Sequence, residues 1–197
     1  CDWSSRRVLF RSDLAEQIFS GQVTVERVKA IERSTGFDRD LWSQLASSGI
    51  QALCVPEDRG GSGFGAVELS LAPMAQGRHV APVPLWTCGV AALALADFGT
   101  AGQHALLAGI ADGSQVVTIA LAEFGVNDVM RPGVRGERKG SDIRIVGTKP
   151  AVPFGQHADV VLVPVTNGDS PAIAIVPMST PGIVVTEVVT TNHEPQA

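Results

Sequence analysis

The chain has 197 residues, of which 45% are hydrophobic and 18% charged, so it can bury a core in one large domain or two small ones. The formal net charge is −5, and the two basic pairs, residues 6–7 and 138–139, are short and isolated. Nucleic-acid binding needs clustered lysine and arginine, so this balance argues against that class of function. No apolar stretch approaches the ~18 residues of a membrane span.

The three cysteines, Cys1, Cys54 and Cys88, have no C-x-x-C spacing, which argues against a metal site or a disulfide framework. Cys54 stands in an apolar run, which is typical of a small buried side chain. Free cysteines fit a reducing compartment, and we expect a cytoplasmic protein. The chain begins with Cys1 and ends in polar residues 192–197; both ends look like cuts, so we expect a piece of a longer protein.

The first half of the chain has helical periodicity. Gly21 is expected to separate two helices, and Asp38 is placed as the N-cap of a third, which Gly49 ends. Residues 50–56 are expected to be extended and are followed by a glycine-rich loop at 57–63. Further helices are predicted at residues 66–78, at 85–98, which is buried on most sides, and at 103–111, with Thr100 and Gln103 forming a capping box.

The second half of the chain has the pattern of short strands that follow a turn at residues 112–114. Strands are predicted at residues 116–121, 134–138, 143–146, 160–165, 172–176 and 183–189, the second and third of them forming a hairpin. We therefore predict an α+β chain. An all-helical domain at residues 1–115 is followed by an antiparallel, β-barrel-like domain at residues 116–197.

Motifs at the joints of these elements resemble a known family. Residues 41–50 (LWSQLASSGI) and 55–63 (VPEDRGGSG) follow the W-x-x-L-x-x-x-G and V-P-E-x-x-G-G-x-G patterns of the acyl-CoA dehydrogenase N-terminal domain. Residues 106–113 resemble a leucine-rich helix of this family that ends in glycine. Gly147-Thr148-Lys149 and the later Ala158-Asp159 resemble its G-x-K and A-D pair. The chain is therefore identified as a member of the acyl-CoA dehydrogenase family, over roughly residues 10–190.

The resemblance implies a fold and a reaction. Family members have an N-terminal helical domain, a middle β-domain and a C-terminal four-helix bundle, and only the first two are recognisable here. They use FAD to remove hydrogens from Cα and Cβ of an acyl-CoA thioester. The glutamate base of most members lies in the bundle, so no catalytic residue is nominated here. The implied partners are an acyl-CoA substrate, electron-transfer flavoprotein, and further subunits in a homo- or hetero-oligomer.

The first segment implied to face the flavin is residues 121–128, which resembles the family's T-E-P-x-x-G-S-D stretch with one residue fewer. The resemblance implies flavin contacts, largely through the backbone, from Leu121, Ala122, Glu123 and Asn127. Asn127 and Asp128 are the implied substrate contacts.

The second segment is residues 149–153, where the family usually has K-x-W-x-T or K-x-W-x-S. Ala151, Val152 and Pro153 are therefore implied to lie against the flavin, although Ala151 and Pro153 supply neither the tryptophan nor the hydroxyl. This K-x-A-V-P form resembles that of actinobacterial members, some of which pair with a second, different subunit and are associated with degradation of steroid side chains.

Alternatives stay open at several points. The glycines at 60–63 lack the ending of a P-loop, so a structural turn is favoured over a phosphate cradle. Residues 83–95 are expected in the core, with lining of an acyl-chain cavity as the second interpretation. For the whole chain, the alternatives to a dehydrogenase are a non-catalytic partner subunit, a flavin monooxygenase or oxidase on the same fold, and an inactive fragment. Fatty and steroid thioesters are both compatible with the sequence.

Overall fold

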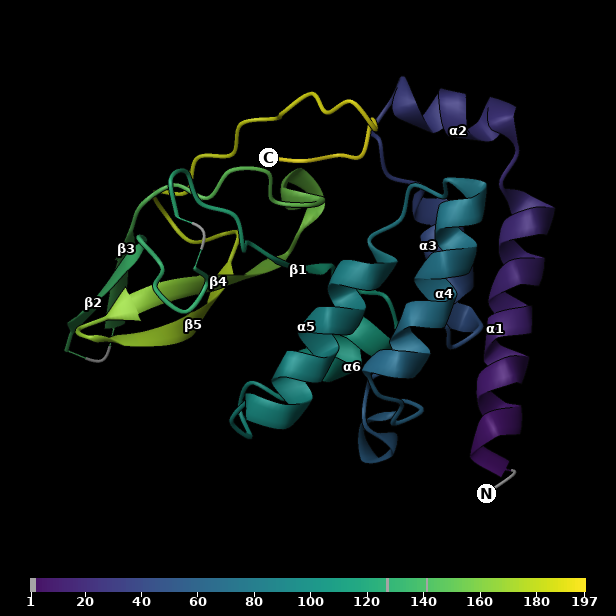
Figure 1. Cartoon of the computed structure of the whole chain (residues 1–197), viewed down its shortest axis with the longest axis horizontal. Coiled ribbons are helices and arrows are strands. Elements are labelled where there is room, and N and C mark those ends of the chain that lie inside the picture. The colour runs from purple at the N-terminus through teal and green to yellow at the C-terminus, as the bar shows by residue number, and fades with distance from the viewer. Residues whose placement is uncertain (1–2, 127, 141) are drawn as a thin grey trace. The chain divides into compact units, whose positions relative to one another are not determined.

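The computed structural model describes residues 3–126, 128–140 and 142–197, with side chains from residue 11 onward except residue 138. The chain divides into two compact units, Cys1–Val116 and Val117–Ala197. Helices make up the first unit, and the strands all lie in the second (Figure 1). The predicted α+β class, with helices first and a β-rich part second, is therefore confirmed.

The helical unit contains α1 (Trp3–Gln22), α2 (Val25–Glu32), α3 (Arg39–Ser47), α4 (Ala66–His79), α5 (Leu85–Phe98) and α6 (Ala105–Ala111). Helix α1 packs along α4 and α3, α4 packs on α5, and α5 packs on α6 (Figure 1). The core between them is apolar and includes Phe19, Phe37, Leu41, Leu45, Ala91 and Ile110. Burial of this apolar surface is the main force that holds the helices together.

Helix ends follow the expected capping chemistry. Asp38 accepts a hydrogen bond from the Leu41 amide at 3.0 Å and begins α3, and Gly49 takes a left-handed φ of +72° just past its end. The expected break between the first two helices is confirmed, although it falls after Gln22, where Thr24 caps α2. Gln103 accepts from the Thr100 amide at 2.8 Å as predicted, but regular helix starts only at Ala105.

The extended conformation predicted for residues 50–56 is wrong, because residues 51–54 form successive turns. Their apolar side chains are buried, Ile50 and Val55 almost completely. The apolar residues therefore predicted burial correctly but not backbone conformation, because the periodicity of so short a run does not distinguish a strand from a turn. Trp42 is buried as expected, and its indole nitrogen donates to the Gly113 carbonyl at 3.1 Å.

The β unit contains β1 (Val117–Ile119), β2 (Arg135–Lys139), β3 (Asp142–Val146), β4 (Val160–Asn167) and β5 (Ser170–Pro177). The sheet order is β1-β4-β2-β3, and β5 pairs with β4 along its whole length. The predicted hairpin is β2 and β3, in antiparallel register from Arg135 opposite Val146. A cluster of buried valines, three of them on β4, contributes to the core: Val134, Val152, Val161, Val163 and Val165.

The sheet is mixed, whereas the sequence favoured an antiparallel one. Strand β1 runs parallel to β4, with Val117 opposite Val160, and β2 meets β4 through the parallel pair Arg135 and Thr166. The side-chain alternation of a strand is the same in either orientation, so the pattern of apolar residues does not encode it.

The strand predicted at residues 183–189 is absent from the structure. Only an isolated bridge joins Val188 to Gln196, and the side chains of Val184 and Val189 are almost fully exposed. Valine-rich composition favours a strand only where a neighbouring strand and a buried face are available. Within the described residues, no helix is both long enough and apolar enough to cross a membrane.

Candidate functional site

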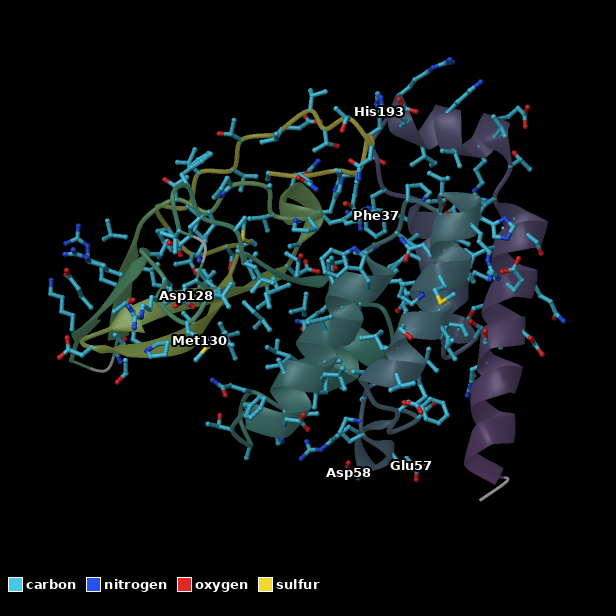
Figure 2. The ribbon with its side chains drawn as sticks, viewed as in Figure 1. Phe37, Glu57, Asp58, Asp128, Met130 and His193 are labelled. Atoms are coloured by element: carbon cyan, nitrogen blue, oxygen red, sulfur yellow. The ribbon has the colours of Figure 1, made fainter. Side chains whose placement is uncertain are left out.

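The first predicted flavin segment follows directly after β1. Leu121 and Ala122 are exposed there, and an isolated bridge between Glu123 and Val126 closes a tight turn. Asp128 is also exposed (Figure 2) and accepts a hydrogen bond from the Met130 amide at 2.9 Å. The predicted contact Asn127 lies outside the described residues.

The carboxylate of Glu123 is the centre of this site. One of its oxygens accepts from the Gly133 amide at 2.5 Å and from the Val134 amide at 3.2 Å. Its other oxygen forms an ion pair with the ammonium group of Lys149. The carboxylate therefore joins three stretches of chain: the turn after β1, the entry to β2, and the second predicted flavin segment.

The ion pair is shielded from solvent, since 7% of the Glu123 side chain and 9% of the Lys149 side chain are exposed. Burial raises the pKa of Glu123, but the hydrogen bonds from Lys149, Gly133 and Val134 lower it by more, so the pKa lies below its usual value. The carboxylate is thus held ionised. It is a fixed acceptor and is unsuited to removing a proton from a substrate.

The second predicted segment, residues 149–153, is tied down by its own backbone. Val152 exchanges two hydrogen bonds with Ala197, at 2.7 and 3.1 Å. The Thr118 hydroxyl donates to the Pro153 carbonyl at 2.7 Å. Ala151 is exposed and has a left-handed φ of +54°, a conformation that is uncommon for a residue other than glycine.

Few amide groups in these two segments remain open to a ligand. Pro150 and Pro153 have no N–H group, and the Val152 amide is already donated. Among the described residues, no acceptor is found for the backbone amides of Leu121, Ala122 and Ala151. The amides of these three exposed residues are therefore donors that the polar edge of a flavin could use.

A small hollow lies between the two segments, lined in part by Leu121, Glu123, Asp128 and Lys149. Its volume of about 10 Å³ accommodates no more than one water molecule. A flavin would therefore lie on the exposed surface of these segments and not inside the hollow. The predicted roles of the site residues remain predictions.

The importance of Lys149, Gly133 and Thr118 was missed by sequence reasoning. Lys149 was noted only as part of a family motif, although a lysine between Thr148 and Pro150 in a mostly apolar stretch is a signal for a buried partner. Gly133 and Thr118 act through hydrogen bonds between a side chain and the backbone of a distant segment, which leave no pattern in a sequence.

The glycine-rich loop of the helical unit is a structural turn. The amides of residues 61–64 all donate to carbonyls of residues 52–56, so they are not available to a phosphate group. The first two residues of the loop, Glu57 and Asp58, are exposed (Figure 2). Among the described residues, no three His, Cys, Asp or Glu side chains are grouped to bind a metal ion.

Comparison with known proteins gives a consistent picture. Residues 12–114 match the acyl-CoA dehydrogenase N-terminal domain. Acyl-CoA dehydrogenase FadE27 of Mycobacterium tuberculosis is 34% identical over 183 residues, which are 91% of this chain and 48% of that protein.

Two solved structures are also similar. A variant of the Tcur3481-Tcur3483 steroid ACAD has 41% identity and a TM-score of 0.93 over 98% of this chain and 54% of that one. The ChsE4-ChsE5 complex from Mycobacterium tuberculosis has 31% identity and a TM-score of 0.87 over 96% of this chain and 52% of that one. The chain spans about half the length of these relatives.

The helical unit and the mixed β unit define the N-terminal and middle parts of a flavoprotein dehydrogenase fold. The chain belongs to the acyl-CoA dehydrogenase family. Members of this family bind FAD, and the two structural relatives are complexes named for two different chains.

Proposed function

We propose that this chain is the N-terminal and middle part of an FAD-dependent acyl-CoA dehydrogenase, with domains at residues 1–115 and 116–197. The observation that carries the proposal is the Glu123 carboxylate, which holds together the two segments implied to face the flavin. FAD would accept the β-hydrogen of the substrate as hydride.

The residues of this chain would bind and orient the cofactor. The exposed amides of Leu121, Ala122 and Ala151 would donate to the polar edge of the flavin, where fixed donors stabilise negative charge. Val152 and Pro153 would set the position of Ala151 through their bonds to Ala197 and Thr118. No residue of this chain is proposed as the base that removes the α-proton.

The proposed substrate is an acyl-CoA thioester with a steroid-derived acyl group. The basis is the name of the similar Tcur3481-Tcur3483 steroid ACAD, with 41% identity, and the K-x-A-V-P form at Lys149–Pro153. A second, different subunit is the proposed partner, because both structural relatives are named for two chains. Electron-transfer flavoprotein is the proposed acceptor, in the cytoplasm.

A second candidate is a non-catalytic subunit that completes a partner subunit's site. It is favoured by the small number of hydrogen-bond donors at residues 150–153. Among the described residues, only the Ala151 amide of this segment has no acceptor, and none of its side chains carries a hydroxyl. Such a subunit would stabilise a heteromer without turning over substrate at its own β unit.

The test is to purify the full-length protein alone and together with a homologous second subunit, and to record the visible absorbance. We expect a flavin spectrum that bleaches when a steroid-derived acyl-CoA is added, and more slowly with a straight-chain acyl-CoA. A complex with one flavin per pair of subunits, where two catalytic subunits would hold two, would favour the non-catalytic subunit. Absence of flavin from both preparations would contradict both candidates, and rapid oxygen consumption by reduced flavin would point to a monooxygenase or oxidase.

A further inference from the structure

We propose that Glu123 and Lys149 are positioning residues that couple the two flavin-facing segments, so that neither segment keeps its binding geometry without the other. The proposal rests on the proposed function for the identity of the ligand. The coupling itself rests on contacts within the β unit.

The first argument is that Glu123 is hydrogen-bonded to backbone that the sheet already holds in place. Gly133 and Val134 donate to its carboxylate. Val134 and Pro132, on either side of Gly133, are held on β4 by Thr166. The Val134 carbonyl accepts from the Thr166 amide at 2.8 Å, and the Pro132 carbonyl accepts from the Thr166 hydroxyl at 2.5 Å. The turn after β1 therefore takes its position from the sheet through one carboxylate.

The second argument is that Glu123 also fixes the other segment. Lys149 stands at the start of residues 149–153. Its side chain is 9% exposed, and its ammonium group pairs with the same carboxylate. A buried charge without its partner is costly, so a move of either side chain would draw the other with it or expose both to water. Ala151, two residues further on, would then shift with Lys149.

The third argument comes from Gly133, where a side chain would collide with the Glu123 carboxylate. A Cβ added there would lie 2.8 Å from the Glu123 carboxylate oxygen. Gly133 thus allows the close approach of the carboxylate to its amide. A Gly133→Ala substitution should displace the carboxylate without altering any charge, which gives a second and independent way to disturb the coupling.

The turn itself has little else to hold it. Residues 121–126 lie outside the named strands. Among the described residues, the hydrogen bonds and the ion pair that join this turn to the rest of the β unit run through Glu123. The register of β4 with β5 and of β2 with β3 does not involve Glu123. Loss of the ion pair should therefore loosen both segments while the sheet stays folded.

The experiment uses the full-length protein with whatever second subunit it needs to retain FAD. The variants are Glu123→Gln, Lys149→Met and Gly133→Ala, with Lys149→Arg as the conservative change. Arg27→Met is the matched control, since it breaks the Arg27–Asp38 ion pair in the helical unit. The FAD dissociation constant is measured by fluorescence titration, and amide hydrogen exchange is followed by mass spectrometry.

We expect Glu123→Gln, Lys149→Met and Gly133→Ala each to weaken FAD binding by about tenfold or more, and to speed exchange in both residues 121–126 and 149–153. Lys149→Arg should retain most of the affinity because it keeps the charge. Arg27→Met should lower the melting temperature and leave FAD affinity and the exchange of both segments unchanged.

The proposal is overturned if Lys149→Met speeds exchange only near its own position, or if Arg27→Met weakens FAD binding as much as the site variants do. If the wild-type protein retains no FAD, the proposed function fails. The exchange measurement, which needs no ligand, still decides whether the two segments are coupled.

Discussion

Glu123 and Lys149 are 26 residues apart in the chain, yet their side chains form a buried ion pair at the junction of two loops. The pair does not lie within the regular sheet, where backbone hydrogen bonds already fix the strands. Its effect is therefore on the loops that the family resemblance implies to face the flavin. We therefore expect stability and the proposed cofactor binding to be linked at this pair.

The β unit should be sensitive to acid through Glu123. Its pKa in the folded protein lies below the ordinary value of 4.5, since hydrogen bonds outweigh the effect of burial. The stability that it contributes is therefore complete above the ordinary pKa and is lost as the pH falls through the lower, folded pKa. We expect wild type to lose stability more steeply than Glu123→Gln below about pH 5. Urea unfolding at several pH values measures this, and parallel curves would contradict it.

Asp38 should be essential for the helical unit. Its side chain is 2% exposed, caps α3 through the Leu41 amide, and pairs with Arg27 at 2.5 and 2.8 Å. Asp38→Ala removes the cap and leaves the guanidinium with only its long hydrogen bond to Gln22 at 3.4 Å, so we expect a loss of about 3 kcal/mol. Asp40→Ala is the control, because Asp40 is exposed on the same helix. Helical circular dichroism in urea would record the difference.

Gly61→Ala should disrupt the loop after the buried turns. A Cβ at this position would lie 1.9 Å from the Val55 carbonyl oxygen, so the backbone would have to move. We expect a loss of about 2 kcal/mol or more, which is the effect of overpacking at a site that cannot relax. Gly21→Ala, which meets no atom within 4 Å, should instead stabilise α1 by about 0.5 kcal/mol. Equal melting temperatures for the two variants would refute the prediction.

Val80→Gly should stabilise the protein. Val80 ends α4 with a left-handed φ of 54°, which is strained for a β-branched residue, and its side chain is 64% exposed. Glycine removes the strain at little loss of packing, so we expect a gain of about 1 kcal/mol. Met74→Gly, at an exposed position inside the same helix, should cost about 1 kcal/mol. Thermal unfolding of both variants is the measurement.

Cys54 should be unreactive in the folded protein. Burial, together with the nearby Glu68, raises the pKa of its thiol to about 12, so almost no thiolate is present at neutral pH. We expect a maleimide reagent at pH 8 to modify Cys54 and Cys88 slowly in buffer and rapidly in denaturant. Mass spectrometry of the labelled peptides distinguishes them, and fast labelling of Cys54 in buffer would show that the helical unit opens.

The sequence alone was sufficient for the fold class and for most of the helices. Apolar periodicity, the Asp38 cap and the glycines that end helices act over a few residues, so a linear pattern contains them. The order of motifs from Trp42 to Asp159 was also enough to indicate the family to which the chain belongs.

Only the tertiary structure decided the features that depend on partners distant in sequence. The parallel pairing of β1 with β4, the absence of the strand predicted at residues 183–189, and the turns at residues 51–54 depend on which segments meet. The link from Glu123 to Gly133, Val134 and Lys149 is of the same kind. Local sequence sets the conformational preference of a short segment. Long-range hydrogen bonds and burial then choose among the conformations that this preference allows.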